Sequence, residues 1–210
     1  MGVDKKSKSR SATREKILQA AAQVVMERGV EALTLDAVAQ QAEVSKGGLL
    51  YHFPNKNALI VNLGEQLLQN FEAALQNEFE QDDAPGTPGQ WLRAYVRSTE
   101  RMSKESLALF ARLSSILVEM PPELLQSVEA YEQQCHQRLE ADGIDPVQAT
   151  IIQLAIDGLW FSEAFQMALP NQERRAQVVE TLLTMTRSLH STIDNEQWIM
   201  NNYLSLKEED

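Results

Sequence analysis

The sequence has few of the features that mark secreted or membrane proteins. Cys135 is the only cysteine among 210 residues, so the chain cannot close an internal disulfide, and this fits a reducing compartment. No apolar run approaches the roughly 18 residues that a membrane span requires. The polar, basic N-terminus has no apolar segment of a signal peptide. We therefore expect a cytoplasmic protein with no membrane partner.

The sequence also lacks the patterns of an enzyme or a metal site. Its three histidines, His52, His136 and His190, fall in three different predicted elements, so no metal-ligand spacing is present. Cys135 and His136 are neighbours on a predicted helix, where they point about 100° apart and cannot act as nucleophile and base. No glycine-rich phosphate loop is found in a strand-turn-helix context. We therefore expect no catalytic residue, no metal and no cofactor, and predict that the protein is not an enzyme.

Positive charge is scarce overall but is unevenly distributed. The chain has 19 Lys and Arg against 30 Asp and Glu, a net charge of −11, which excludes a protein that is basic throughout. Residues 1–63 contain nine basic and six acidic residues, a net charge of +3, whereas residues 64–210 carry −14. This asymmetry suggests a small module that faces a polyanion, attached to an acidic body. The alternative is a solvated basic tail, because six of the nine positive charges are Lys5, Lys6, Lys8, Arg10, Arg14 and Lys16.

The hydrophobic pattern is helical throughout. Strict alternation is absent, whereas apolar residues recur at i, i+3 and i+4 from Ile17 to the C-terminus, which predicts an all-α fold. Four helices are expected in the first half, with short second and third helices and a long fourth. Their predicted N-caps are Thr13, Thr34, Ser45 and Asn55, with Gly29 ending the first helix in the left-handed αL conformation and Pro54 ending the third.

The predicted fourth helix carries an apolar residue at every fourth position from Leu59 to Phe79. Four residues advance about 400° around a helix, so the stripe drifts by roughly 40° per step. The far end of the stripe must therefore face a different neighbour from the near end. We predict that the first turns pack on an N-terminal module and the last turns on a separate body. The stripe consists of Leu59, Leu63, Leu67, Phe71, Leu75 and Phe79.

Prolines and glycines divide the C-terminal part. Residues 81–89 form the clearest linker by composition, with Thr87 as the N-cap and Pro88 as the first residue of the next helix. Further helices are predicted over residues 122–141, 146–169 and 171–192. Residues 194–210 are expected to dock through Trp198, Ile199, Tyr203 and Leu204 and to end in an acidic tail.

The two short helices and the turn between them fit a helix-turn-helix. Ala39 lies where the helices cross, where a larger side chain would hold them apart, and Val44 fills the turn. Gly47 and Gly48 keep the next helix slim enough to approach a backbone. A generic pair of helices shows the same spacing, so this pattern alone leaves both interpretations open.

The wider segment 13–63 resembles the DNA-binding domain of the TetR family of transcriptional regulators. The resemblance rests on Arg28-Gly29, the Thr34 start, the turn 44–47, the aromatic cluster 51–53 and the Asn55-Lys56 opening of the fourth helix. It implies contacts with double-stranded DNA, although capping or packing remains an alternative for several of these residues. Matching positions assign a phosphate-binding cap to Thr34, the start of the recognition helix to Ser45, Lys46, Gly47 and Gly48, its end to Tyr51 and His52, and a phosphate contact to Lys56.

One position departs from the family pattern. Many members carry a phosphate-binding tyrosine where this chain has Leu50, so Tyr51 or His52 is expected to take over that contact. Because few large polar side chains lie on the recognition helix, specificity must come from two half-sites and from DNA shape. This favours a homodimer on a palindromic operator. Residues 1–12 are expected to form a basic flexible arm that adds sequence-independent affinity.

Residues 64–193, by the same resemblance, form a helical ligand-binding and dimerisation domain. Asp157 lies in an apolar helix and needs a partner, which could be Arg112, a subunit interface or a cationic ligand. For the other positions, an ordinary intrachain core is the alternative. The predicted dimer interface is Ile152, Ile156, Leu159, Val178, Val179, Leu182, Leu183 and Leu189. The predicted ligand site is Met102, Phe110, Leu113, Leu117, Asp157, Trp160, Phe161 and Phe165.

Together these patterns predict a sequence-specific DNA-binding transcriptional regulator. We expect a repressor that binds a palindromic operator as a homodimer and is released by an unidentified small-molecule effector. The alternative is a helical regulator on the same scaffold that acts through protein contacts without binding an operator, with the acidic body as its binding surface.

Overall fold

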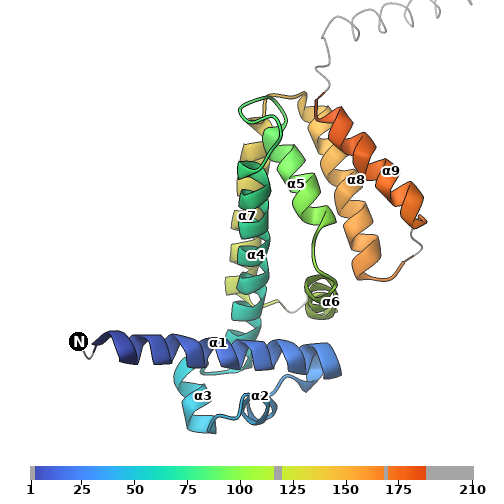
Figure 1. Cartoon of the computed structure of the whole chain (residues 1–210). Coiled ribbons are helices and arrows are strands. Elements are labelled where there is room, and N and C mark those ends of the chain that lie inside the picture. Colours follow the sequence, from blue (N-terminus) through green and yellow to red (C-terminus); the bar gives the residue numbers. More distant parts are fainter. Residues whose placement is uncertain (1–2, 116–119, 168–169, 188–210) are drawn as a thin grey trace, which may run out of the picture.

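The computed structural model describes residues 3–115, 120–167 and 170–187, and this part of the chain contains helices and no strand. The predicted all-α fold is confirmed. No helix in the described ranges is long and apolar enough to cross a membrane. The elements are α1 (Val3–Arg28), a 3₁₀ turn (Val30–Ala32), α2 (Leu35–Gln41), α3 (Lys46–His52), α4 (Lys56–Glu80), α5 (Gln90–Glu100), α6 (Lys104–Leu113), α7 (Pro122–Glu140), α8 (Pro146–Ala164) and α9 (Gln172–Met185) (Figure 1).

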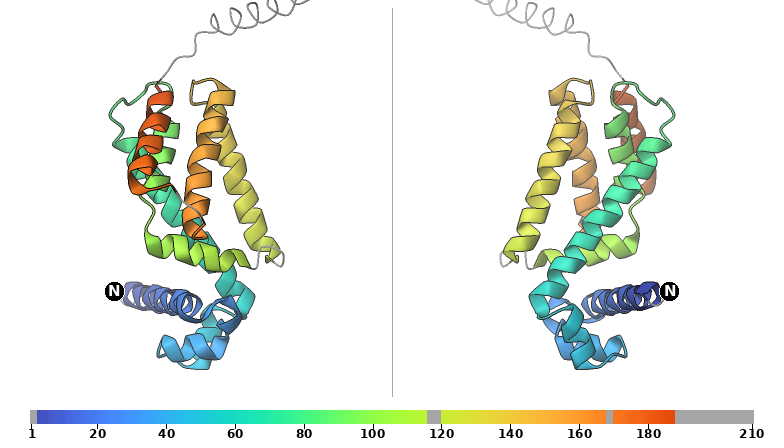
Figure 2. Two further views of the ribbon diagram at one scale, coloured as in Figure 1. Left: turned by 90° about the vertical axis from the view of Figure 1, so that its right-hand side faces the viewer. Right: turned by 90° about the vertical axis from the view of Figure 1, so that its left-hand side faces the viewer.

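The helices form a small head and a larger body. In Figure 1, α1 crosses the base of α4, and α2 and α3 lie at the extreme end of the head. Helix α4 runs from the head up through the body, where it packs along α5. Helices α8 and α9 lie side by side on one flank of the body, with α7 next to α8 (Figure 2). The head and the α8–α9 pair therefore occupy different ends of the molecule.

Local signals determine where α2, α3 and α4 begin. The side chains of Thr34, Ser45 and Asn55 accept hydrogen bonds from the backbone N–H three residues later, at 3.1, 3.0 and 2.8 Å. These bonds satisfy amides that a helix N-terminus leaves without an internal partner. The three predicted N-caps are confirmed.

The predicted start of the first helix is wrong. Helix α1 begins at Val3 and not after Thr13, so residues 3–12 form the first turns of α1. This segment contains neither proline nor glycine, and nothing in it interrupts a helix. At the other end, Gly29 has the expected positive φ of 83°, but its ψ of 166° lies outside the αL region, and a 3₁₀ turn follows.

Helix α4 connects two clusters of buried side chains, as its drifting stripe predicts. Leu59 and Leu63 are buried in the cluster that forms the core of the head, and Leu67 packs against it. Leu75 is buried in the cluster of the body, against which Phe71 and Phe79 pack. The change of neighbours along the stripe is confirmed.

The core of the head also takes side chains from the body. Leu113 of α6 and Leu124 of α7 are buried in the same cluster as the helix-turn-helix. A Cβ on Gly64 of α4 would lie 2.5 Å from Cδ1 of Leu124, so the missing side chain allows α4 and α7 to approach closely. The packing is therefore continuous across residue 63, where the charge of the sequence changes sign.

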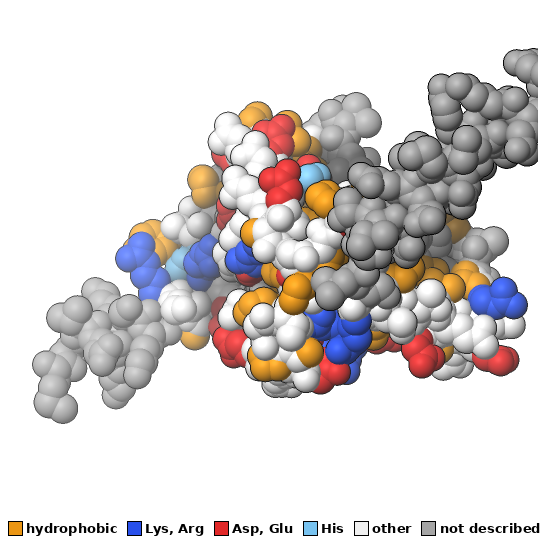
Figure 3. Space-filling model, turned by 90° about the horizontal axis from the view of Figure 1, so that it is seen from above, with side chains coloured by type: hydrophobic (Ala, Val, Ile, Leu, Met, Phe, Trp, Pro, Cys, Tyr) orange, Lys and Arg blue, Asp and Glu red, His pale blue; other side chains and the backbone are white. Residues whose placement is uncertain are grey.

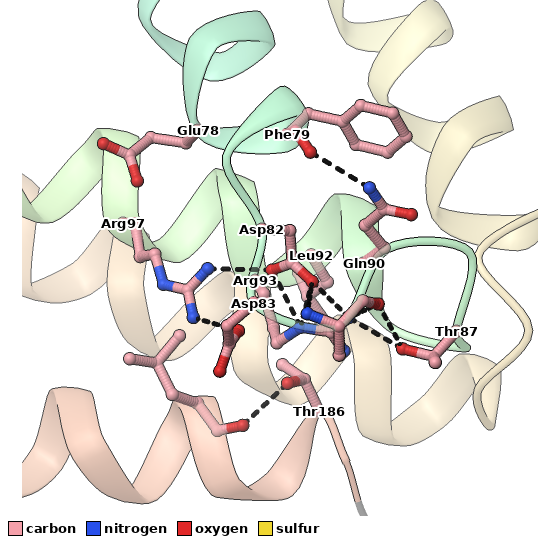
Figure 4. Close-up of polar contacts among 12 residues, drawn as sticks. Glu78, Phe79, Asp82, Asp83, Thr87, Gln90, Leu92, Arg93, Arg97 and Thr186 are labelled. Atoms are coloured by element: carbon pink, nitrogen blue, oxygen red, sulfur yellow. Dashed lines mark hydrogen bonds and ion pairs between the residues drawn. The ribbon is translucent and has the colours of Figure 1, made fainter.

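Residues 81–89, whose composition predicts a linker, form a corner that is held by several hydrogen bonds and ion pairs. The Arg93 side chain is buried, and its Nη2 lies 2.8 Å from Oδ1 of the equally buried Asp82 (Figure 4). Arg97 bridges Asp82 and Asp83 at 2.8 Å each, and Arg187, which follows the C-cap of α9, also pairs with Asp83. Acidic and basic side chains are accordingly seen side by side at this end of the molecule (Figure 3). The corner joins α4, α5 and α9.

The same corner explains why the predicted cap of α5 is wrong. The N-cap is Gly89, with φ 79° and no side chain, and α5 begins at Gln90. The Thr87 hydroxyl instead donates to the Ala84 carbonyl at 2.7 Å and accepts from Nη2 of Arg93 at 2.9 Å. The demand of a buried guanidinium for acceptors therefore overrides the local capping signal.

Two of the later helices end earlier than predicted. The N-caps Asp145 and Asn171 are confirmed by hydrogen bonds of 2.8 Å from Gln148 N and Arg174 N, and α7 opens at Pro122 as expected. Helix α8 ends at Ala164, because Gln166 turns to a positive φ of 52°, and α9 ends at Met185 with Thr186 as its C-cap. The predictions for Leu189, His190 and residues 194–210, including Trp198, Ile199, Tyr203 and Leu204, lie outside the described residues.

Candidate nucleic-acid interface and internal cavity

The turn between α2 and α3 holds the second helix at a fixed angle to the first. Val44 N donates to Ala39 O at 3.0 Å, and Glu43 takes a positive φ of 51° to reverse the chain. Ala39 is buried and Val44 packs against the head core, as predicted for both. Leu49 of α3 is fully buried, so one face of this helix is fixed in the head and the other is free to contact a partner.

The N-terminus of α3 is open to solvent. Ser45, Lys46 and Gly47 are all exposed. A Cβ on Gly47 would meet no atom within 4 Å, whereas one on Gly48 would lie 3.2 Å from the Ser45 hydroxyl. A partner backbone could therefore approach Gly47 closely, while Gly48 allows the capping hydroxyl to lie close to the helix. The first turn presents backbone N–H groups and a positive helix end, which favour an anion.

Lys46 is not a free cation in this structure. Its Nζ lies 2.9 Å from Oδ1 of Asp36 in the first turn of α2, and both side chains are largely exposed. The pair joins the start of α3 to the first turn of α2, which Thr34 caps. A phosphate that engaged Lys46 would have to compete with Asp36. This pair could not be predicted from the sequence, because its members are ten residues apart on different helices.

The end of α3 carries an exposed aromatic ring next to a basic residue from α1. Tyr51 is 63% exposed, and the guanidinium of Arg10 lies 4.7 Å from the centre of its ring. His52 is half-buried and packs edge-on against Tyr51 at 5.1 Å. Leu50 is 40% exposed, which leaves an apolar side chain where the family pattern has tyrosine. The helical start of α1 thus adds Arg10 to the candidate surface.

Two further basic side chains of α1 are engaged within the head. Arg14 donates to the side chain of Asn62 and lies over the ring of Phe53. Lys16 pairs with Glu43 at 3.3 Å. Lys56, the predicted phosphate contact on α4, is half-buried. These contacts fix the orientation of α1 relative to the helix-turn-helix.

The body contains a cavity of about 920 Å³ between α4, α5, α6, α7 and α8. Five of the eight predicted ligand residues line it: Met102, Phe110, Asp157, Trp160 and Phe161. Leu113 is in the head core, Phe165 packs on Phe161 at 4.5 Å beside the cavity, and Leu117 lies outside the described residues. The sequence does not single out the contributions of α4, α5 and α7, because their side chains follow the spacing of ordinary helical packing. The missed residues include Phe71, Tyr95, Arg101, Tyr131 and Cys135.

Asp157 faces this cavity and has a hydroxyl as its partner. The Tyr95 hydroxyl donates to Oδ1 of Asp157 at 2.8 Å, and no ion pair with Arg112 occurs among the described residues. The predicted arginine partner is therefore wrong. Burial raises the pKa of the Asp157 carboxyl, against which the hydrogen bond from Tyr95 acts. Burial likewise raises the pKa of Tyr95, so it remains a hydroxyl donor at neutral pH.

Three of the predicted interface residues belong to the core of the chain itself. Ile152, Ile156 and Leu182 are at most 5% exposed and pack in the body cluster, so the prediction that they contact a second subunit is wrong. These side chains cover one another within the body and do not reach its surface. Leu159, Val178, Val179 and Leu183 are partly buried against the same cluster.

The surface of α8 presents other apolar side chains instead. Val147, Ile151 and Leu154 are 68%, 52% and 66% exposed, and Phe161 is 48% exposed. Their spacing of four, three and seven residues places them along one stripe of the helix. In the described part of the chain, no group of His, Cys, Asp and Glu has the arrangement of a metal site.

Comparison with known proteins agrees with this architecture. Residues 17–63 match the family model described as bacterial regulatory proteins of the tetR family, and residues 89–187 match the tetracyclin repressor-like C-terminal domain. The HTH-type transcriptional regulator RutR of Escherichia coli K12 is 34% identical over 101 residues, which are 48% of this chain and 46% of RutR. The chain thus spans about half the length of this curated relative.

Solved structures share the fold at low sequence identity. A TetR-family regulator from a Rhodococcus species superposes with a TM-score of 0.62 at 20% identity and covers 86% of this chain and all of its own. The multidrug binding protein EbrR, in complex with malachite green, gives a TM-score of 0.61 at 21% identity over 82% of this chain and 96% of its own.

The head and body together define an all-α protein with an N-terminal helix-turn-helix and a helical domain that contains a cavity. Two family models, matched in the expected order, cover most of the described chain. The chain belongs to the TetR family of bacterial regulatory proteins.

Proposed function

We propose that the protein is a DNA-binding transcriptional repressor that acts as a homodimer. The observation that carries this proposal is the exposed N-terminus of α3, held by the turn at Val44 at the extreme end of the head. A helix in this position can enter the major groove without obstruction by the body. Residues 13–63 are the DNA-binding domain in this proposal, and residues from 64 onward bind the effector and the second subunit.

The proposed DNA contacts are those implied by the family pattern, with one addition. Exposed Thr34 and Ser45 present hydroxyls and helix amides to phosphates, and Lys46 contributes charge once it leaves Asp36. Gly47 and Gly48 allow close approach, while Tyr51 and His52 contact the backbone or a thymine methyl. Lys56 binds a phosphate at the start of α4. Arg10, stacked on Tyr51, supplies a further cation.

The homodimer follows from the unpartnered stripe of α8. Val147, Ile151 and Leu154 would remain exposed to water in a monomer, at a cost of about 25 cal/mol for each Å² of apolar surface. A second copy that presents the same stripe across a two-fold axis would cover them. Two heads held in this way read two half-sites of a palindrome.

Effector control is supported by the cavity and by α6. Phe110 of α6 lines the cavity, whereas Leu113, one turn later, is buried in the head core. A ligand that shifts α6 would therefore act on the head directly. An effector that prefers the dimer with wrongly spaced heads would release the operator. The structural relative EbrR is described as a multidrug binding protein, which agrees with a ligand-holding body.

Selection of bound genomic fragments by the full-length chain tests the proposal. We expect recovery of an inverted repeat, and we expect Lys46→Ala to weaken binding to it and to lower the slope of log affinity against log salt by about one. Lys104→Ala is the matched control, because Lys104 is an exposed lysine of the body and should leave both quantities unchanged. Unchanged affinity and slope for Lys46→Ala would show that Lys46 does not contact DNA.

A regulator that acts through protein contacts remains the second candidate. It is favoured by exposed Leu50 on α3 and by the neutralisation of Lys46 by Asp36, both of which reduce the fit of the head to DNA. Recovery of no inverted repeat in the selection would favour this candidate over the first.

A further inference from the structure

We propose that the cavity of the body binds an aromatic cation, with the Asp157 carboxylate as its counter-ion. This proposal rests on the proposed function only in that the ligand would be the effector. The cavity, its rings and its charges support it on their own.

The lining of the cavity is aromatic on two sides. Phe71 of α4 packs edge-on against Tyr95 and Tyr131, with ring centres 5.7 and 6.2 Å apart. Phe110 of α6 packs against Trp160 at 4.4 Å. All five side chains line the same cavity, whose volume of about 920 Å³ accommodates a ligand of several fused rings.

Asp157 connects these two aromatic groups. It accepts a hydrogen bond of 2.8 Å from the Tyr95 hydroxyl, and it lies three residues before Trp160 on α8, so both side chains emerge on the same side of the helix. Its other oxygen, Oδ2, has no hydrogen-bond partner among the described residues. Asp157 is half-buried, and a carboxylate in this setting that is bonded through one oxygen only retains a demand for a donor or a positive charge.

The other charges around the cavity leave this demand unmet. Arg101 is the one arginine or lysine in the described lining, and it is paired with Glu78. Glu132 and His136 are exposed at the surface of α7, where the His136 ring is bonded to the Glu132 carbonyl at 2.9 Å. The lining thus contains three carboxylates against one guanidinium, which favours a cationic ligand over an anionic one.

Two polar groups provide additional sites for the ligand to form hydrogen bonds. The Tyr131 hydroxyl and the Thr99 hydroxyl are buried without a hydrogen-bond partner in the described structure, and both residues line the cavity. A ligand with an amino group or a ring nitrogen beside its positive charge could satisfy them. The aromatic faces of Trp160 and Phe110 add attraction for the same charge.

Two three-ring probes that differ only in charge and in one N-methyl group test the charge preference. N-methylacridinium is a permanent cation, and acridine is the uncharged ring system at pH 8. Calorimetric titration of the full-length chain should show binding of both, with at least roughly tenfold higher affinity for the cation. Equal affinity, stronger binding of acridine, or binding of neither probe would overturn the proposal.

Asp157→Asn separates the effect of the carboxylate charge on binding from the effect of the cavity shape. Asparagine keeps an oxygen that can accept from Tyr95, so acridine binding and a cooperative thermal unfolding transition serve as controls for the fold. We expect the variant to bind acridine as the wild type does and to lose most of the preference for the cation. A preference that persists in this variant would assign the selectivity to another group.

The same design keeps this proposal separate from the proposed function. The titrations contain no DNA, so they report on the cavity alone. Cation preference without recovery of an operator would sustain this inference and contradict the repressor. Binding of an operator by a protein whose cavity shows no charge preference would support the repressor and contradict this inference.

Discussion

Lys46 at the start of α3 and Asp36 in the first turn of α2 form an ion pair of 2.9 Å across the helix-turn-helix. Both side chains are exposed, so the pair contributes little to the stability of the fold. Its position matters more than its strength, because it places a carboxylate beside the cation that the proposed interface uses. In this structure Lys46 therefore already contacts a carboxylate of its own chain.

Asp36→Asn should strengthen binding to DNA. The change releases Lys46 and removes a negative charge that phosphates would repel, so we expect affinity to rise roughly five-fold at low salt and the gain to shrink as salt increases. Fluorescence anisotropy with the selected operator measures both effects. Glu43→Gln is the matched control, since Glu43 pairs with Lys16 and its loss changes the net charge equally. An equal gain in both variants would assign the effect to net charge alone.

Leu154→Glu should convert the dimer to a monomer. Leu154 is 66% exposed on the apolar stripe of α8, where a second copy would bury the new carboxylate without a partner. Light scattering coupled to size-exclusion chromatography should show twice the 23.6-kDa chain mass for the wild type and the single mass for the variant. Ala130→Glu adds the same charge to an exposed position of α7 and should leave the mass unchanged. A wild-type chain that is monomeric would contradict the proposed interface.

Asp157→Asn should stabilise the unliganded protein at neutral pH. Because burial raises the pKa of Asp157 above its unfolded value, the stability contributed by this carboxyl is fully present below pH 3.8 and is lost as pH rises through the folded pKa. The variant avoids the cost of an ionised buried group, and we expect a gain of about 1 kcal/mol at pH 7. Urea unfolding from pH 4 to pH 8 measures the difference, which should shrink toward the acid end. A difference that is constant with pH would show that ionisation is not its cause.

Gly89→Ala should destabilise the corner at the start of α5 far more than Gly86→Ala. Both glycines have a positive φ, 79° and 74°, which costs an alanine about 1–2 kcal/mol. At Gly89 the new Cβ would also collide with the backbone carbonyl of Thr186, whereas at Gly86 it meets nothing within 4 Å. We expect a loss of roughly 3 kcal/mol or more for Gly89→Ala and about 1 kcal/mol for Gly86→Ala, measured by thermal unfolding. Equal losses would show that α9 moves away from α5 at little cost.

Much of the head could be predicted from the sequence because its determinants are local. A hydroxyl or amide at Thr34, Ser45 and Asn55 reaches the backbone N–H three residues later, and this interaction requires nothing from the rest of the molecule. The stripe along α4 also follows from helical geometry alone, and its division between two clusters was foreseeable from the pitch of the helix.

The candidate sites were less predictable, since they depend on partners far apart in the chain. The sequence predicts Thr87 as a helix cap, but its hydroxyl accepts a hydrogen bond from the buried guanidinium of Arg93. The sequence predicts an arginine as the partner of Asp157, but α5 packs against α8 so that the Tyr95 hydroxyl donates to Asp157. Ile152 reads as an interface residue, yet it is fully buried within its own chain.

The sequence by itself therefore determined the helical class, the helix-turn-helix and the drifting stripe, all of which arise from interactions over a few residues. Only the tertiary structure decided which face of α8 is exposed, which rings enclose the cavity and which carboxylate restrains Lys46. The reason is physical: hydrophobic periodicity gives each helix an apolar side, but the rotation at which that side meets its neighbours is settled by the packing of all helices together.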